Sequence, residues 1–178
     1  IINSGEIGRL ISMESNFGKD ILTRKNFFGF KRRKKLNLNN RLYNKEMGGG
    51  AILDLGCYPV SFSTLIASLV SSIDYDKVQV FDKKKEIGST GVDLDSYASL
   101  RFENGFISKI SASFTKNLGK QTKILGDKGQ LIIEDTWTGQ SKKIFIKKNK
   151  KNKIKNINSN QNIYSYEIQN LSQCILDK

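Results

Sequence analysis

The 178-residue sequence contains no histidine, only two cysteines and a single proline. Without histidine, and with Cys57 and Cys174 far apart, the usual zinc-binding spacings and a disulfide framework are excluded. We therefore expect no metal site and a reducing, cytoplasmic location. The most apolar stretch, residues 60–73, contains five serines and is too short to cross a bilayer, and no secretion signal is visible. We expect no membrane partner.

Acidic residues are also scarce, since 17 Asp and Glu face 30 Lys and Arg, for a net charge of +13. Such an excess can indicate an acidic partner such as nucleic acid. Lysine, asparagine and isoleucine are abundant everywhere, however, including the low-complexity stretch 147–162, which favours a compositional bias. The sequence therefore disfavours a nucleic-acid partner, and its 38% hydrophobic content is typical of one globular domain.

The N-terminal half divides into a strand, an irregular stretch and a helix. Apolar and polar residues roughly alternate over residues 9–17, as in a half-buried strand. Residues 20–44 have no clean period and carry a basic run at 31–35, so we expect an irregular excursion. Residues 51–70 are long and apolar enough for a helix, which Pro59 should kink. The chain starts at isoleucine and ends without a capping glycine, which predicts truncation at both ends.

The C-terminal half has the pattern of hairpin-connected strands. Asn104-Gly105, between two apolar alternating runs, is the strongest hairpin signal because this pair tolerates positive φ. Residues 164–176 place Ile168, Leu171 and Ile175 at helical spacing and should close the domain as an amphipathic helix. The prediction is an α+β fold, a predominantly antiparallel open β-sheet with helices packed on one face. The expected strands are 78–81, 96–102, 106–114, 122–125, 130–134 and 142–147.

The segment with the strongest chemical signal is MGGGAILDLGCYPVSF, residues 47–62. If it is helical from residue 51, Asp54 and Tyr58 lie four residues apart on one face. The preceding glycines allow a ligand to approach, and amides at a helix start favour a negative or hydroxyl-bearing group. Spacing alone leaves a structural role open, with Asp54 in a local network and Tyr58 in the helix-sheet interface. We expect Cys57, without a histidine partner, to be a small buried residue, and Trp137 to be a packing residue.

This segment, preceded by Arg41 and followed by DSYASLRFENGFISKISASF and ILGDKGQLIIED, resembles the Gfo/Idh/MocA oxidoreductase family. The likeness extends from SGEIGRLISMESNFG to YEIQNLSQCILDK, which is nearly the whole chain. It looks most like the branch of glucose-fructose oxidoreductase, dihydrodiol dehydrogenase and aldose dehydrogenases, in which tyrosine replaces the histidine of other members. The resemblance implies a reaction in which hydride passes between NAD or NADP and a sugar or related polyol or diol.

Carried over to this sequence, the family pattern assigns Tyr58 as proton donor and acceptor. It places Asp54, the acidic residue one helical turn earlier, as the second catalytic residue and Arg41 as the arginine before the glycines. Together with Gly49 and Gly50 at the helix start, Arg41 is expected to bind substrate. Because the resemblance places the cofactor residues mainly in another domain, none is assigned here.

The sequence departs from the family where the cofactor would bind. Its only proline is Pro59, so the family's Glu-Lys-Pro segment is absent, and no Gly-x-Gly-x-x-Gly follows a strand. Residues 1–178 are therefore expected to be a C-terminal substrate-binding and oligomerisation domain without its N-terminal dinucleotide-binding domain, inactive alone and homo-oligomeric through the sheet face.

Two alternatives remain. One is a basic binding module that contacts phosphates through residues 31–35 and 147–155. The other is a noncatalytic dimerisation domain, which predicts that Asp54 and Tyr58 are buried and point away from any cleft.

Overall fold

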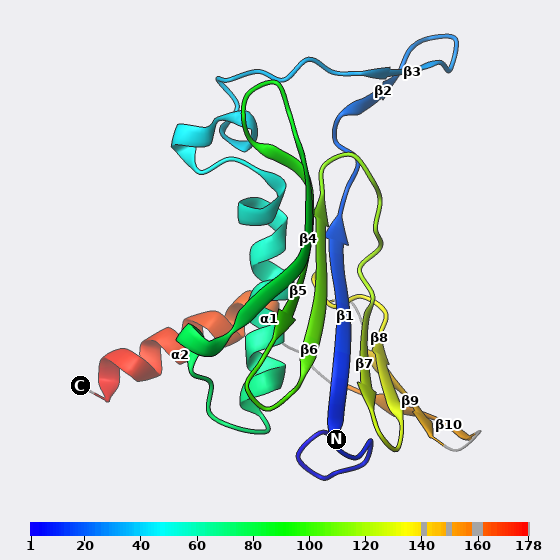
Figure 1. Ribbon diagram of the computed structural model, residues 1–178, viewed down its shortest axis with the longest axis vertical. Helices are drawn as coiled ribbons and strands as arrows, with labels where there is room; N and C mark the ends of the chain where they lie inside the picture. The colour runs from blue at the N-terminus through cyan, green and yellow to red at the C-terminus, as the bar shows by residue number, and fades with distance from the viewer. Residues whose placement is uncertain (140–141, 149–150, 158–161, 178) are drawn as a thin grey trace.

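The centre of the molecule is an eight-stranded sheet in the strand order β10-β9-β8-β7-β1-β6-β5-β4 (Figure 1). The computed structural model describes residues 1–139, 142–148, 151–157 and 162–177. β1 and β6 are parallel, and every other neighbouring pair is antiparallel, which confirms the predicted α+β fold. The strands are β1 (Leu10–Gly18), β4 (Gln79–Ile87), β5 (Asp93–Arg101), β6 (Ile107–Ser113), β7 (Thr122–Gly126), β8 (Gln130–Ile133), β9 (Lys143–Lys148) and β10 (Lys151–Asn156).

The predicted hairpin at Asn104-Gly105 connects β5 to β6 and is confirmed. Gly105 has a φ of +82°, and the Phe102 amide donates to the Phe106 carbonyl at 3.0 Å. The Asn104 side chain accepts from the Phe106 amide at the same distance. Both phenylalanines are buried, at 3% and 1% exposure, so the turn fixes the strand register while its flanking rings enter the core.

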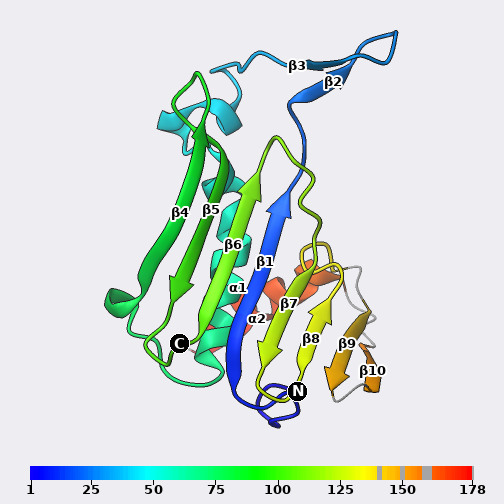
Figure 2. The same ribbon diagram turned by 45° about the vertical axis from the view of Figure 1, so that its right-hand side comes forward.

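One helix, α1 (Cys57–Ser68), covers one face of the sheet (Figure 2). Ile66 and Ala67 are buried against the sheet, and Ser63 is hydrogen-bonded to Ser108 on β6 at 2.6 Å. The helical segment Lys45–Ser68 is the single one among the described residues that is long and apolar enough to span a membrane by length and composition. Its apolar residues are only partly buried, since Leu53 and Leu65 are 60% and 53% exposed.

The irregularity in this helix does not lie at Pro59, as the sequence predicted. Pro59 is buried in the first turn of α1, and the distortion is a π-helical turn at Ile52–Gly56 immediately before it. Gly56 explains the close packing, because a Cβ there would lie 2.5 Å from Ile52 Cδ1 and 3.3 Å from Ala112 Cβ on β6. The helix thus packs closely on the sheet here, and an added Cβ would be in tight contact with Ala112.

The stretch between β1 and this helix is irregular apart from a small hairpin, β2 (Thr23–Lys25) and β3 (Lys31–Arg33), and the short 3-10 turns Arg41–Tyr43 and Lys45–Met47. A further 3-10 turn, Tyr75–Lys77, precedes β4.

The lysine-rich stretch that the sequence marks as low complexity supplies β10, which the strand pattern missed. β10 pairs antiparallel with β9, so backbone pairing rather than apolar alternation defines it.

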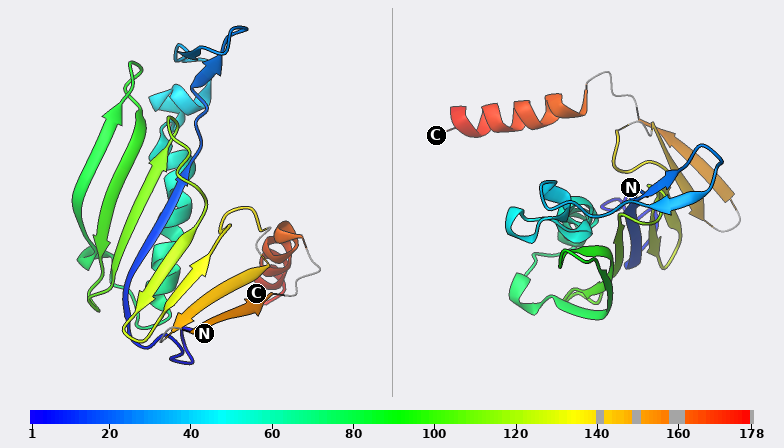
Figure 3. Two further views of the ribbon diagram at one scale, coloured as in Figure 1. Left: turned by 90° about the vertical axis from the view of Figure 1, so that its right-hand side faces the viewer. Right: turned by 90° about the horizontal axis from the view of Figure 1, so that it is seen from above.

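The C-terminal helix α2 (Ile163–Leu176) is present as predicted, but it does not close the domain. Ile168, Leu171 and Ile175 are 65%, 64% and 63% exposed. Seen from above, α2 stands apart from α1 and the sheet (Figure 3). The prediction of docking was wrong because helical spacing defines an apolar stripe without specifying the surface that covers it.

Candidate active site

The glycine run before the π-helical turn is shaped by internal packing. Gly49 and Gly50 are buried. A Cβ on Gly49 would lie 2.5 Å from the Arg41 carbonyl oxygen, and one on Gly50, where φ is +123°, would lie 2.2 Å from Asp93 Oδ1. The two glycines therefore let the 3-10 turns and β5 pack tightly against the helix start. Their predicted contact with a substrate stays a prediction.

The backbone amide of Ile52, at the helix start, is hydrogen-bonded to the carboxylate of Asp93 on β5. The Ile52 amide donates to Asp93 Oδ2 at 2.9 Å, and Ser96 Oγ donates to the same oxygen at 2.6 Å. This amide is therefore bound by a residue 41 positions later in the chain, and a ligand at the other amides of the helix start stays a prediction. The Asp93 side chain thus connects β5 to the helix.

Arg41 and Asp54 form an ion pair, with Arg41 NH2 at 2.7 Å from Asp54 Oδ1. The Asp54 side chain is 19% exposed and that of Arg41 is 61% exposed. Arg41 begins a 3-10 turn whose N-cap is Asn40, which accepts from the Leu42 amide. The structure thus joins two of the residues that the sequence singled out, and the pairing commits one Asp54 oxygen to the guanidinium.

Tyr58 belongs to an aromatic cluster, defined here as Phe17, Tyr58, Phe62 and Trp137. The Tyr58 ring meets Phe17 edge-on, with centroids 5.5 Å apart, and lies 6.1 Å from Trp137. Phe17 stacks on Trp137 at 5.9 Å, and Phe62 meets Trp137 edge-on at the same distance. Trp137 Nε1 donates to the Asn16 carbonyl at 2.8 Å, which fixes the indole.

The cluster holds the Tyr58 ring but leaves its hydroxyl accessible. Tyr58 is 49% exposed, and no described residue hydrogen-bonds its hydroxyl. Neighbouring Cys57 is exposed too, so the expectation of a small buried cysteine was wrong. The packing role expected for Trp137 is confirmed, although its place beside Tyr58 was missed. A lone tryptophan after a strand indicates packing, and spacing does not reveal its partner.

A phenol in this position can donate or accept a proton at an incoming oxygen, and the surrounding rings offer an apolar wall. The part of the chain that the structure describes contains no group of His, Cys, Asp or Glu suited to a metal ion. The helix starts do not fit a dinucleotide pyrophosphate, because Asp93 binds the Ile52 amide and Asn162 binds the Tyr164 amide. Among the described residues, both of these amides therefore already have a side-chain partner.

The chain is thus an α+β domain with an open, mostly antiparallel sheet, one covering helix and a tyrosine held at the start of that helix. Residues 1–132 match the family model described as the GFO/IDH/MocA C-terminal domain. The chain belongs to the Gfo/Idh/MocA family of oxidoreductases.

Two relatives with named activities are similar in sequence to this chain. Trans-1,2-dihydrobenzene-1,2-diol dehydrogenase of Xenopus tropicalis is 31% identical over 141 residues, which cover 76% of this chain and 41% of that protein. A dTDP-3,4-didehydro-2,6-dideoxy-alpha-D-glucose 3-reductase of Saccharopolyspora spinosa is 24% identical over 140 residues, covering 78% of this chain and 36% of that protein. The chain thus spans less than half the length of these relatives.

Solved structures show the same fold. The aldose-aldose oxidoreductase from Caulobacter crescentus, complexed with glycerol, superposes with a TM-score of 0.74 at 16% identity, over 99% of this chain and 48% of that one. A 3-ketoreductase from Actinomadura kijaniata, in complex with NADP and TDP-benzene, gives 0.76 at 16% identity, over 99% and 49%. At these identities the likeness concerns the fold.

Proposed function

We propose that this chain is the C-terminal substrate-binding and oligomerisation domain of an NAD(P)-dependent oxidoreductase that acts on a sugar or a related polyol or diol. The observation that carries the proposal is the half-exposed Tyr58, held by aromatic rings at the helix start of a chain that matches this family's C-terminal domain. Tyr58 acts as proton donor and acceptor at the substrate oxygen.

The neighbouring groups take supporting roles in this proposal. Asp54 and Arg41 form a charged pair. The Arg41 side chain is 61% exposed, and its guanidinium has donors left for a substrate hydroxyl. Gly49 and Gly50 shape the backbone beside it. The apolar wall of Phe17 and Trp137 suits the C–H face of a sugar or diol. It also keeps the phenol ring of Tyr58 in one orientation.

The cofactor belongs to a domain that this chain does not contain. Relatives include an NADP-bound reductase, and the family supplies hydride chemistry from NAD or NADP. Since the helix starts here are occupied by Asp93 and Asn162, we assign the dinucleotide site to an N-terminal domain. The exposed apolar stripe of α2 is a surface that such a domain would cover.

The sheet face opposite α1 is the proposed homo-oligomeric contact. Ser12 on β1 lies between Ile107 on β6 and Leu125 on β7, and Leu125 is 42% exposed. Such a half-apolar face is typical of an interface between copies.

A cytoplasmic location completes the proposal, because both cysteines are free and exposed.

The two alternatives fit these observations less well. A noncatalytic dimerisation domain predicts a buried Tyr58, yet this residue is 49% exposed. A basic module that reads nucleic acid from its sheet needs exposed aromatics there, whereas Phe102, Phe106 and Phe114 are 3%, 1% and 1% exposed.

The test compares Tyr58→Phe with Tyr75→Phe in the complete reading frame, extended upstream of Ile1. Tyr75 is 69% exposed, follows α1 and serves as the matched control. With polyol and diol substrates and NAD or NADP, kcat for Tyr58→Phe should fall by on the order of a hundredfold, with KM little changed. We expect the 178-residue chain alone to be inactive. Unchanged kcat in Tyr58→Phe would exclude Tyr58 as the proton donor, and an upstream frame without a dinucleotide motif would refute the two-domain assignment.

A further inference from the structure

The β2–β3 hairpin projects away from the sheet (Figures 1 and 2). Its turn carries an exposed aromatic tip, defined as Phe27, Phe28 and Phe30. The three rings are 99%, 79% and 70% exposed, and Phe27 and Phe28 meet edge-on at 5.6 Å. Asn26 shapes the turn by accepting from the Phe30 amide at 2.8 Å, and Gly29 supplies a φ of +81°. The tip is therefore a formed turn that displays aromatic surface.

Behind the tip lies a cationic collar, defined as Arg24, Lys25, Lys31 and Arg32. The strand register places Arg24 opposite Arg32 and Lys25 opposite Lys31. Like charges directly across a strand pair repel each other, and residues 21–45 contain no acidic residue to offset them. None of the four forms an ion pair with a described residue. The nearest acidic influence is Asp20, whose pKa is lowered by hydrogen bonds, chiefly from Thr23, and also by the charge of Lys31. An anionic partner would relieve this repulsion.

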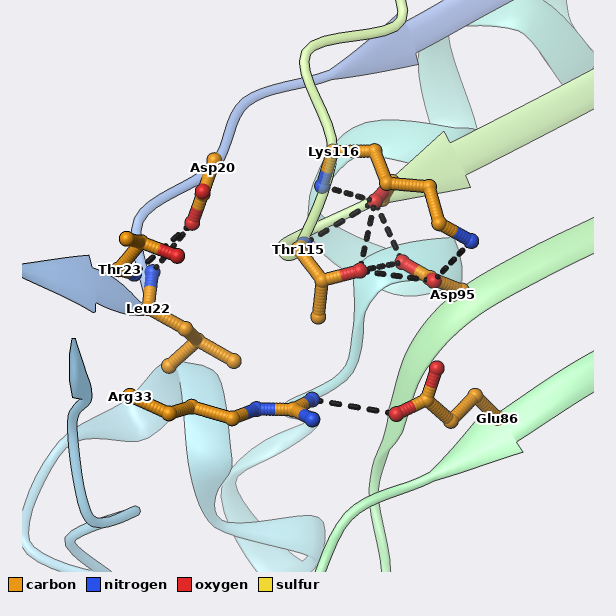
Figure 4. A network of polar contacts seen from close by, with 9 residues as sticks. Asp20, Leu22, Thr23, Arg33, Glu86, Asp95, Thr115 and Lys116 are labelled. Carbon is orange, nitrogen blue, oxygen red and sulfur yellow. Dashed lines mark hydrogen bonds and ion pairs between the residues drawn. The ribbon is translucent and has the colours of Figure 1, made fainter. Parts of the chain in front are cut away.

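The base of the hairpin, in contrast, is firmly attached. Leu22 is 1% exposed, and Asp20 accepts hydrogen bonds from the amides of Leu22 and Thr23. Arg33 NH2 lies 3.1 Å from Glu86 Oε1 on β4 (Figure 4). Lys34 Nζ donates to the Ile21 carbonyl at 2.8 Å. The domain thus holds the base in place while the tip and collar are bare.

We propose that this hairpin docks the protein on an anionic lipid surface, with the aromatic tip in the interfacial region and the collar at the phosphate groups. The arrangement is segregated, because the rings occupy the turn and the cations occupy the strands behind it. Segregation of this kind matches a bilayer, where an apolar layer lies beyond the charged headgroups. The tip is convex, whereas a small-molecule site is concave.

Other partners fit less well. Single-stranded nucleic acid favours aromatic rings interleaved with cations along one groove, and here the two are separated along the hairpin. A second copy of this chain carries the same net charge of +13 and would be repelled by the collar. The proposal departs from the sequence-based expectation of no membrane partner. That expectation rested on the absence of a spanning or secreted segment, and surface docking requires neither.

The experiment measures sedimentation of the 178-residue chain with vesicles of phosphatidylcholine, with and without phosphatidylglycerol. We expect binding to the anionic vesicles only, and two variants separate the two parts of the hairpin. Phe27→Ser/Phe28→Ser/Phe30→Ser keeps the charge and should weaken binding by at least about tenfold. Lys25→Gln/Lys31→Gln/Arg32→Gln should weaken it by on the order of a hundredfold. Circular dichroism and Trp137 emission, remote from the hairpin tip, check that each variant is folded.

The control removes three charges elsewhere, Lys147→Gln/Lys151→Gln/Lys155→Gln, from exposed positions on or near β9 and β10. It should weaken vesicle binding less than about fivefold, because distant charges are screened beyond about 10 Å. The proposal is overturned if this control weakens binding as much as the collar variant, or if the serine variant binds as tightly as the parent. Tighter, phenylalanine-dependent binding to a single-stranded oligonucleotide than to vesicles would also overturn it.

Discussion

The Ile52 amide donates a 2.9 Å hydrogen bond to the carboxylate of Asp93, which connects the first turn of the central helix to β5. Asp93 also accepts from Ser96 Oγ, so its carboxylate serves both its own strand and the helix. Because Arg41, Asp54 and Tyr58 are all positioned by this helix or by the turns just before it, the contact sets the geometry of the candidate site.

Replacing Asp93 should therefore loosen the helix start. We expect Asp93→Ala to lower the free energy of unfolding by about 2 kcal/mol, since it removes two hydrogen bonds to a charged acceptor at a helix start. Urea denaturation measures the change, and Asp76→Asn, at an exposed turn, is the control. If both variants lower the free energy of unfolding by the same amount, the hydrogen bond between Asp93 and the helix start has no special role.

Gly50 should tolerate substitution far less than Gly48, although both have positive φ. A Cβ at Gly48 meets nothing within 4 Å, whereas one at Gly50 would lie 2.2 Å from Asp93 Oδ1. Gly48→Ala should cost about 1 kcal/mol of backbone strain, and Gly50→Ala at least about 2 kcal/mol more, because it also displaces Asp93. Equal thermal midpoints for the two variants would contradict this packing role.

The buried pair of Ser63 and Ser108 should show energetic coupling. Their hydroxyl oxygens lie 2.6 Å apart, both residues are 0% exposed, and Ser63 also donates to the Pro59 carbonyl. Each single alanine variant should cost about 1–3 kcal/mol, because it leaves a buried hydroxyl without that partner. The double variant should cost less than the sum, by at least about 0.5 kcal/mol in a double-mutant cycle. Additive losses would show that the pair acts independently.

The stability of the fold should fall in acid partly through Asp95. Burial raises the pKa of this carboxyl, but hydrogen bonds from Lys116, Ser113 and Thr115 and the Lys116 charge outweigh burial, so its pKa is below the ordinary 3.8. A carboxyl with a depressed folded-state pKa stabilises the fold fully above its unfolded-state pKa and loses that contribution as pH falls through the folded-state value. The affected window therefore lies below about pH 4.

Asp95→Asn tests this linkage. The variant should be about 2 kcal/mol less stable than the parent near pH 7, because a charged acceptor is lost. This difference should shrink as the pH is lowered from 4 to 2.5, which urea titrations at each pH measure. A difference that stays constant across that range would mean that the Asp95 charge does not contribute.

Local patterns in the sequence predicted most of the elements. Asn104-Gly105 predicted its hairpin because the positive φ that Gly105 adopts is a local preference of glycine and needs no distant contact. The π-helical turn at Ile52–Gly56 was not predicted, and neither was the close packing of its last residue, Gly56, on Ala112 of β6. β10 was missed because its lysine-rich residues carry no alternation and its strand exists through pairing with β9.

The candidate site divides in the same way. The sequence by itself determined the glycine run, the spacing of Asp54 and Tyr58, and the family pattern around them, because these are short-range features of one segment. Only the tertiary structure decided that Arg41 pairs with Asp54, that Asp93 takes the helix-start amide, and that Phe17 and Trp137 enclose the Tyr58 ring. These contacts join residues up to 120 positions apart in the case of Phe17 and Trp137, and sheet register and packing, rather than local preference, bring such residues together.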